Sequence, residues 1–129
     1  SPDGRWIAYE SSESGSYQVY ILPFTGAGGR RQLSTNGGTR PHWRRDGKEL
    51  FFLSSDLKIM AAEIKLGSTT VDVGSVRPLF QIWPYLFGAP DAYDVTKDGQ
   101  RFLVATSVAM EASSPVTLVV NWLAEVKKK

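Results

Sequence analysis

Apolar residues gather in short runs along the chain, and three of these runs share the same surroundings. Each run closely follows an Asp-Gly pair and is closed by a Ser or Thr. The runs lie at residues 6–9, 50–53 and 102–105. Because they are apolar at consecutive rather than alternate positions, they indicate strands covered on both faces. Their β-branched and aromatic content argues against helices.

The Asp-Gly pairs mark a repeated turn. They stand at Asp3-Gly4, Asp46-Gly47 and Asp98-Gly99, 43 and 52 residues apart. An Asp carboxylate can accept a hydrogen bond from the backbone N–H two residues on, and Gly adopts a positive φ without a Cβ clash. Between extended segments, each pair therefore predicts a hairpin turn.

Further strands are expected around each run. A strand follows each run after a polar turn, at 17–22, 57–64 and 116–122. Shorter outer strands are expected at 31–33 and 77–80, where Pro78 suits an edge because it has no N–H to donate. Strands also precede the later turns, at 40–43 and 92–95, and residues 67–74 are expected to form a hairpin connection. Four antiparallel strands in about 45 residues are the size of a β-propeller blade.

The predicted fold is all-β, with about three four-stranded antiparallel blades of an incomplete propeller. Blade one covers about residues 1–36, blade two 37–88 and blade three 89–123, with a tail at 124–129. Blade one lacks its innermost strand and blade three lacks its outermost strand. Because a closed ring needs about four to eight blades, we expect the chain to be the C-terminal part of a larger propeller. We also expect it to self-associate through its open blade edges.

Composition narrows the function classes without naming an activity. Of the 129 residues, 42% are apolar, which is enough for a folded core. The sequence has no run of about 18 apolar residues for direct membrane insertion. It has no Cys, which excludes thiol chemistry and disulfides. The formal charge of +2 depends on the three final Lys residues, and this near-neutral balance argues against a nucleic-acid partner.

Residues 1–9, Ser-Pro-Asp-Gly-Arg-Trp-Ile-Ala-Tyr, resemble the signature of TolB-type repeats, also called WD40-like β-propeller repeats. The turns at Asp46 and Asp98 are looser versions that lack the Ser-Pro pair. Residues 76–81, 93–104 and 119–122 are similar to the C-terminal blades of bacterial propellers attached to serine/threonine protein kinase domains.

This resemblance implies a bacterial scaffold or sensor segment on the periplasmic or extracytoplasmic side of a membrane. The kinase association concerns a neighbouring domain. The sequence contains no Gly-rich kinase loop and no His-Arg-Asp catalytic loop, so the resemblance implies no kinase activity for this chain.

The first group of candidate binding residues is His42, Trp43 and Arg44, on a strand expected to line the central channel. His42 is the single His of the sequence. One interpretation makes it a proton carrier or metal ligand. We favour the other interpretation, a strand His with local hydrogen bonds, because no catalytic motif surrounds it.

The second group lies in the segment 81–90, which lengthens the second repeat and carries Trp83, Tyr85 and Phe87. Exposed Trp and Tyr are typical anchors of binding surfaces. The alternative, which we favour, is that these rings fold down onto the blade, because a contiguous exposed aromatic patch is costly in water.

Together these features predict a non-catalytic propeller module that binds a protein or a small polar ligand. No cofactor and no catalytic residues are expected, because the Asp residues recur once per blade and are assigned to turn formation. The alternative is the non-catalytic propeller portion of a prolyl-oligopeptidase-like hydrolase.

Overall fold

The computed structural model describes residues 1–83 and 93–106, together with the backbone of 116–120. Within these ranges the chain forms strands and no helix, so no helix there is long and apolar enough to cross a membrane. The strands are β1 (Trp6–Ser11), β2 (Gln18–Pro23), β3 (Arg31–Gln32), β4 (Thr39–Trp43), β5 (Glu49–Leu53), β6 (Lys58–Leu66), β7 (Val71–Gln81), β8 (Tyr93–Val95), β9 (Arg101–Ala105) and β10 (Val116–Val120). The all-β prediction is confirmed, and every predicted strand has a counterpart.

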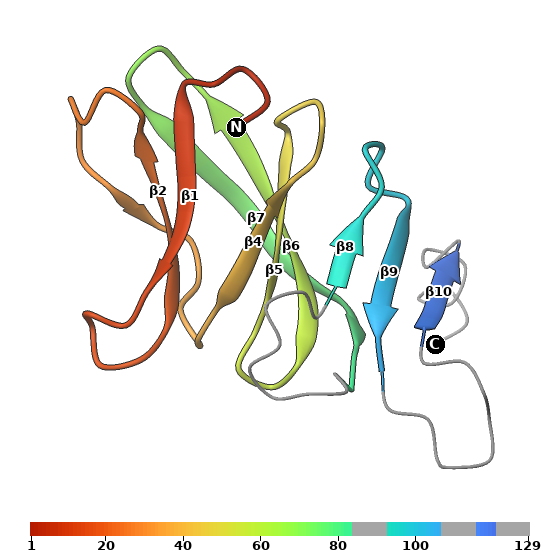
Figure 1. Cartoon of the computed structure of the whole chain (residues 1–129). Coiled ribbons are helices and arrows are strands. Elements are labelled where there is room, and N and C mark those ends of the chain that lie inside the picture. The colour runs from red at the N-terminus through yellow and green to blue at the C-terminus, as the bar shows by residue number, and fades with distance from the viewer. Residues whose placement is uncertain (84–92, 107–115, 121–129) are drawn as a thin grey trace, which may run out of the picture.

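The strands form three separate antiparallel sheets, which lie side by side in Figure 1. The first sheet has the order β1-β2-β3, the second β4-β5-β6-β7 and the third β8-β9-β10. In each sheet, every strand pairs with the strand that precedes or follows it along the chain. Each sheet is therefore a simple meander, and the second sheet lies between the other two.

The middle of the fold is β5, whose side chains point alternately toward the two neighbouring sheets. Leu50 and Phe52 pack with residues of the first sheet, among them Trp6 and Ile21. Phe51 and Leu53 pack with residues of the third sheet. The ring of Phe51 meets the ring of Phe102 edge to face at 5.2 Å. The prediction of a strand covered on both faces is thus confirmed for the run at 50–53.

The other two runs are covered on one face only. Ile7 on β1 and Leu103 on β9 are exposed, whereas Trp6, Phe102 and Val104 are buried. The physical reason is position in the stack, because the first and third sheets each have a single neighbouring sheet among the described residues.

Strand β7 is longer than the predicted outer strand at 77–80. It begins at Val71, so the hairpin connection expected at 67–74 is confined to a tight turn in which Gly67 N–H donates to Thr70 O at 2.8 Å. The early start is explained by Val71 and Val73, which pack against the apolar cluster between the first and second sheets. Two register shifts along β6 and β7 accommodate this length.

The three Asp-Gly turns have the same geometry. Their glycine φ angles are 71°, 71° and 73° at Gly4, Gly47 and Gly99. In each turn the glycine N–H donates to the carbonyl three residues earlier, at 2.8–2.9 Å. Each Asp Oδ1 accepts the N–H two residues on, at 3.0–3.1 Å. The predicted turn chemistry is confirmed in all three copies.

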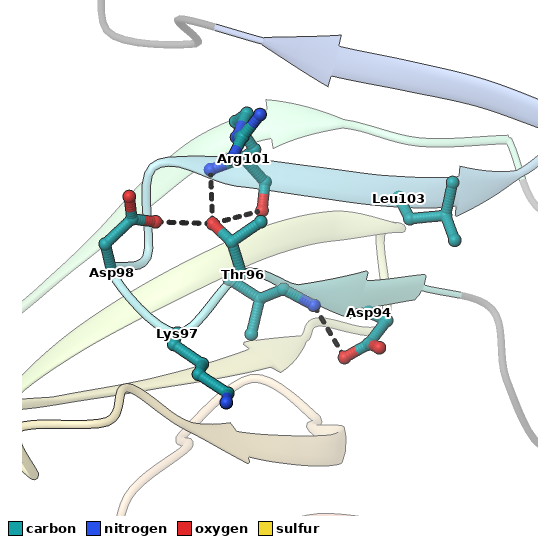
Figure 2. Close-up of a pocket in the computed structure, with 7 residues that line it drawn as sticks. Asp94, Thr96, Lys97, Asp98, Arg101 and Leu103 are labelled. Atoms are coloured by element: carbon teal, nitrogen blue, oxygen red, sulfur yellow. Dashed lines mark hydrogen bonds between the residues drawn. The ribbon is translucent and has the colours of Figure 1, made fainter.

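Each Asp also has a second partner, which is supplied by the residue two positions before it. The hydroxyls of Ser1 and Thr96 donate to Asp3 and Asp98 at 2.5 Å, and Figure 2 shows the Thr96 contact. In the second turn Arg44 takes this role and its guanidinium binds Asp46 at 2.7–2.8 Å.

These contacts favour the ionised carboxylates. The Ser1 hydroxyl lowers the pKa of Asp3 from 3.8 to about 2, and the Arg44 guanidinium lowers the pKa of Asp46 to about 2. The Thr96 hydroxyl lowers the pKa of Asp98. Because the folded pKa values lie below the unfolded ones, the stabilisation is present above about pH 4 and is lost as the pH falls toward 2.

We expect the Asp46→Asn variant to be less stable than the native chain at about pH 6, by no more than about 1 kcal/mol because the side chain is partly exposed. The difference should shrink as the pH falls toward 2, where the native carboxyl also becomes neutral. Thermal unfolding of both proteins between pH 2 and 6 measures it. A difference that is constant with pH would contradict the role of the ionised carboxylate.

We expect Gly99→Ala to destabilise the fold more than Gly4→Ala, although both glycines have the same φ. An added Cβ at Gly99 would lie 2.8 Å from Arg44 Cδ and 3.0 Å from Phe51 Cζ, whereas at Gly4 it meets nothing within 4 Å. Backbone strain of roughly 1–2 kcal/mol applies to both, and overpacking adds roughly 1–3 kcal/mol at Gly99. Urea unfolding of both variants tests this, and equal losses would contradict it.

Candidate functional site

An irregular segment interrupts β4, at the edge of the second sheet. Thr39 pairs with Leu53 and His42 pairs with Phe51, so β4 has one extra residue between these pairs. This is a β-bulge. Arg40 in the bulge has a φ of 53°, a left-handed conformation that costs roughly 1–2 kcal/mol for a residue with a Cβ. Pro41 follows, and its missing N–H is tolerated at an edge or a bulge.

Residues of both neighbouring sheets hold the bulge in place. The Arg40 N–H donates to Glu10 Oε2 of β1 at 2.5 Å. The Arg40 carbonyl accepts a hydrogen bond from the Tyr93 hydroxyl of β8 at 2.7 Å. Burial raises the pKa of the Tyr93 phenol above its ordinary value of 10.0, so the hydroxyl remains a donor. Arg40 is therefore the point at which side chains from all three sheets meet, and such over-determined strain is characteristic of functional sites.

A hollow of about 660 Å³ lies between β1 and β4, next to the bulge. We call this hollow the inner groove. It is lined by Ala8, Tyr9, Glu10, Tyr17, Thr39, Arg40, Pro41 and His42. The ring of Tyr9 stacks on Tyr20 at 5.6 Å, and Tyr17 is 54% exposed. The groove thus combines the aromatic rings of two tyrosines with the acidic Glu10 and the basic side chains of Arg40 and His42.

His42 lies at the groove and also contacts the third sheet. Its ring is 4.7 Å from the ring of Tyr93, and its Nδ1 is 3.8 Å from Asp94 Oδ1. No group of three or more potential metal ligands occurs in the described part of the chain. These contacts agree with the interpretation of His42 as a strand His with local partners.

Trp43 and Arg44 turn away from the groove toward structural partners. Trp43 is half-buried and packs against the apolar cluster between the first and second sheets. Arg44 binds Glu49 at 2.5 Å as well as Asp46, and Glu49 in turn binds Arg77 at 2.9 Å. Both side chains therefore support the second sheet.

The aromatic segment lies only in part within the described structure. Trp83 follows β7 and is 65% exposed, but it does not line the inner groove. Tyr85 and Phe87 lie outside the described residues.

Two other hollows are weaker candidates for a ligand site. One of about 650 Å³ lies beside the Asp46 turn, where Arg5 is paired with Asp3 and Arg44 with Asp46 and Glu49. Figure 2 shows the other, of about 550 Å³, on the face of the third sheet that carries Leu103. In the first hollow the charged side chains already neutralise one another, and the second is an open face of a sheet. Both therefore present fewer groups to a ligand than the inner groove does.

Sequence reasoning did not single out Tyr9, Glu10 and Tyr17 as groove residues. Tyr9 belongs to an apolar run and Tyr17 begins a predicted strand, so both were assigned to the framework. The available signal was Pro41 directly after Arg40 inside a predicted strand, because a proline there indicates an edge or a bulge.

Comparisons with known proteins found a distant relative but no family to which the chain can be assigned. No protein-family model matches the chain. A curated protein of Agrobacterium fabrum, described only as an uncharacterized protein, is 30% identical over 107 residues. The match covers 79% of this chain and 36% of the relative, so the chain spans little more than a third of the length of that protein.

We expect Tyr93→Phe to lower the free energy of unfolding by about 1 kcal/mol, because the hydrogen bond to the Arg40 carbonyl is lost. Tyr20→Phe is the matched control, since the Tyr20 ring is equally buried but its hydroxyl is 3.4 Å from Ser14 Oγ. Urea unfolding of both variants measures the difference. Equal losses would show that the Tyr93 hydroxyl does not hold the bulge.

Proposed function

We propose that the chain is a segment of a β-propeller that acts as a non-catalytic binding module, with the inner groove as its binding surface. The ligand is a protein segment or a small polar molecule. The observation that carries the proposal is the groove itself, where a strained and doubly anchored residue, Arg40, lies beside accessible aromatic and charged side chains.

The arrangement of the sheets supports a propeller. The two interfaces between sheets are built alike: in each, the run that follows an Asp-Gly turn packs against the corresponding run of the next sheet. The turns of the second and third sheets also lie together, since Arg45 N–H donates to Lys97 O at 3.1 Å. A repeated interface of this kind between antiparallel meanders resembles the packing of propeller blades around an axis.

The side chains of the groove suit recognition. Tyrosine offers a large amphipathic contact area at low entropic cost and is common at binding hot spots. Tyr17 is available for such contact, while the Glu10 carboxylate is held in place by the backbone N–H that Arg40 donates to it. The wider setting, a scaffold or sensor beside a bacterial kinase domain, belongs to the same proposal and is supported by the sequence resemblance alone.

We expect ligands from a library of short peptides and polar fragments to perturb the amide NMR signals of the inner groove. Tyr17→Ala should weaken binding of the best ligand by about tenfold, as is typical for an aromatic anchor. Phe24→Ala is the matched control, because Phe24 is 69% exposed and does not line the groove. Perturbations that cluster elsewhere, or equal effects of the two variants, would refute the groove as the binding surface.

A further inference from the structure

The loop between β3 and β4 contains Asn36 followed directly by Gly37. An Asn side chain in this position is open to attack by its own backbone, because a glycine has no side chain to hinder the approach of its nitrogen. Asn36 is exposed. In the ranges that the structure describes, neither its side-chain amide nor the Gly37 N–H takes part in a hydrogen bond. Both reacting groups are therefore available.

The three Asp-Gly turns show how a pair of the same kind is protected. In each turn the glycine N–H donates to the carbonyl three residues earlier, at 2.8–2.9 Å, so its nitrogen is held away from the carboxyl carbon. Each Asp Oδ1 accepts the N–H two residues on. The lowered pKa values of these carboxyls keep them ionised, and a carboxylate is a poor target for a nucleophile. Among the contacts of the described residues, no such restraint acts on Asn36.

We propose that Asn36-Gly37 is a site of spontaneous covalent modification, at which the Asn36 side chain loses its amide and becomes aspartate or isoaspartate. The Gly37 nitrogen forms a bond to Asn36 Cγ, the Cγ–Nδ2 bond breaks, and ammonia leaves with the proton of the Gly37 nitrogen. Water then opens the resulting cyclic imide. Addition of water at Cγ gives aspartate. Addition at the main-chain carbonyl carbon gives isoaspartate, whose backbone passes through Cβ and Cγ.

The loop has little room for the longer backbone of isoaspartate. The Ser55 hydroxyl, in the turn between β5 and β6, donates to the Asn36 carbonyl at 2.7 Å. Even a Cβ added at Gly37 would lie 2.7 Å from Ser55 Cβ. Because isoaspartate inserts a methylene group into the main chain, it should loosen this contact with the second sheet. Thr39, which begins β4 and lines the inner groove, lies only three residues after Asn36.

The Asp46→Asn variant provides a matched comparison, because it places the same reactive pair inside a protected turn. The full chain of this variant is incubated in mildly alkaline buffer and, in parallel, in concentrated urea. Mass spectrometry with site-resolved fragmentation follows the loss of ammonia at positions 36 and 46. In the folded chain we expect position 36 to react about five to ten times faster, because reaction at position 46 first requires the hydrogen bond from Gly47 to Arg44 to open.

In urea the turn is lost, and the two rates should converge. A ratio of rates that is the same in buffer and in urea would overturn the role of the protected glycine N–H. Asn36 that stays intact in the folded chain while the unfolded chain reacts would overturn the assignment of the site.

The effect on packing has its own control. Ion exchange separates the modified native chains by their added negative charge, and fragmentation gives the isoaspartate content of each fraction. The Asn36→Asp variant carries the same charge on an unaltered backbone. We expect the isoaspartate fraction to unfold at a lower urea concentration than this variant. Equal midpoints would show that the loop accommodates the longer backbone and would overturn the loosened contact with Ser55.

Discussion

The two-sided burial of β5 is the constraint on which the rest of the structure depends. Four consecutive residues, 50–53, are all buried, and alternate side chains serve two different interfaces. A strand of this kind cannot form the surface of a two-layer protein, because one of its faces would place large apolar side chains in water. It requires a covering layer on each side, and here the first and third sheets form these layers.

The Asp-Gly turns also contribute to the contact between neighbouring sheets. Gly99 lies so close to Phe51 and Arg44 that a side chain at this position would press on the second sheet. Arg44 in turn holds Asp46 in its own turn and Glu49 at the start of β5. The third Asp-Gly turn is thus both a hairpin turn and a close contact between the third and second sheets, whereas a Cβ at Gly4 would meet nothing within 4 Å.

The strand positions and turns were predictable because their causes are local. An Asp carboxylate and a glycine with positive φ fix each turn within a few residues, and a short apolar run follows each one. The full length of β7 and the left-handed conformation of Arg40 were not predictable, since they depend on distant partners. Val71 and Val73 join an apolar cluster, and Arg40 is held by Glu10 and Tyr93. The sequence placed Trp43 and Arg44 on the correct strand. It did not predict that their side chains point away from the groove, because this depends on the bulge and on the ion pair between Arg44 and Glu49.

Several features that limit strand pairing lie along the side of β1 that faces β4. Unpaired strand edges attract other strands, and proteins commonly restrict them with charged side chains, bulges or capping groups. All three devices occur here: Ser1 caps Trp6, the Glu10 carboxylate lies at the edge, and the bulge is located on the facing strand. The Arg40 N–H donates to Glu10 of β1 and the Arg40 carbonyl accepts from Tyr93 of β8, so the bulge joins the first and third sheets to the second.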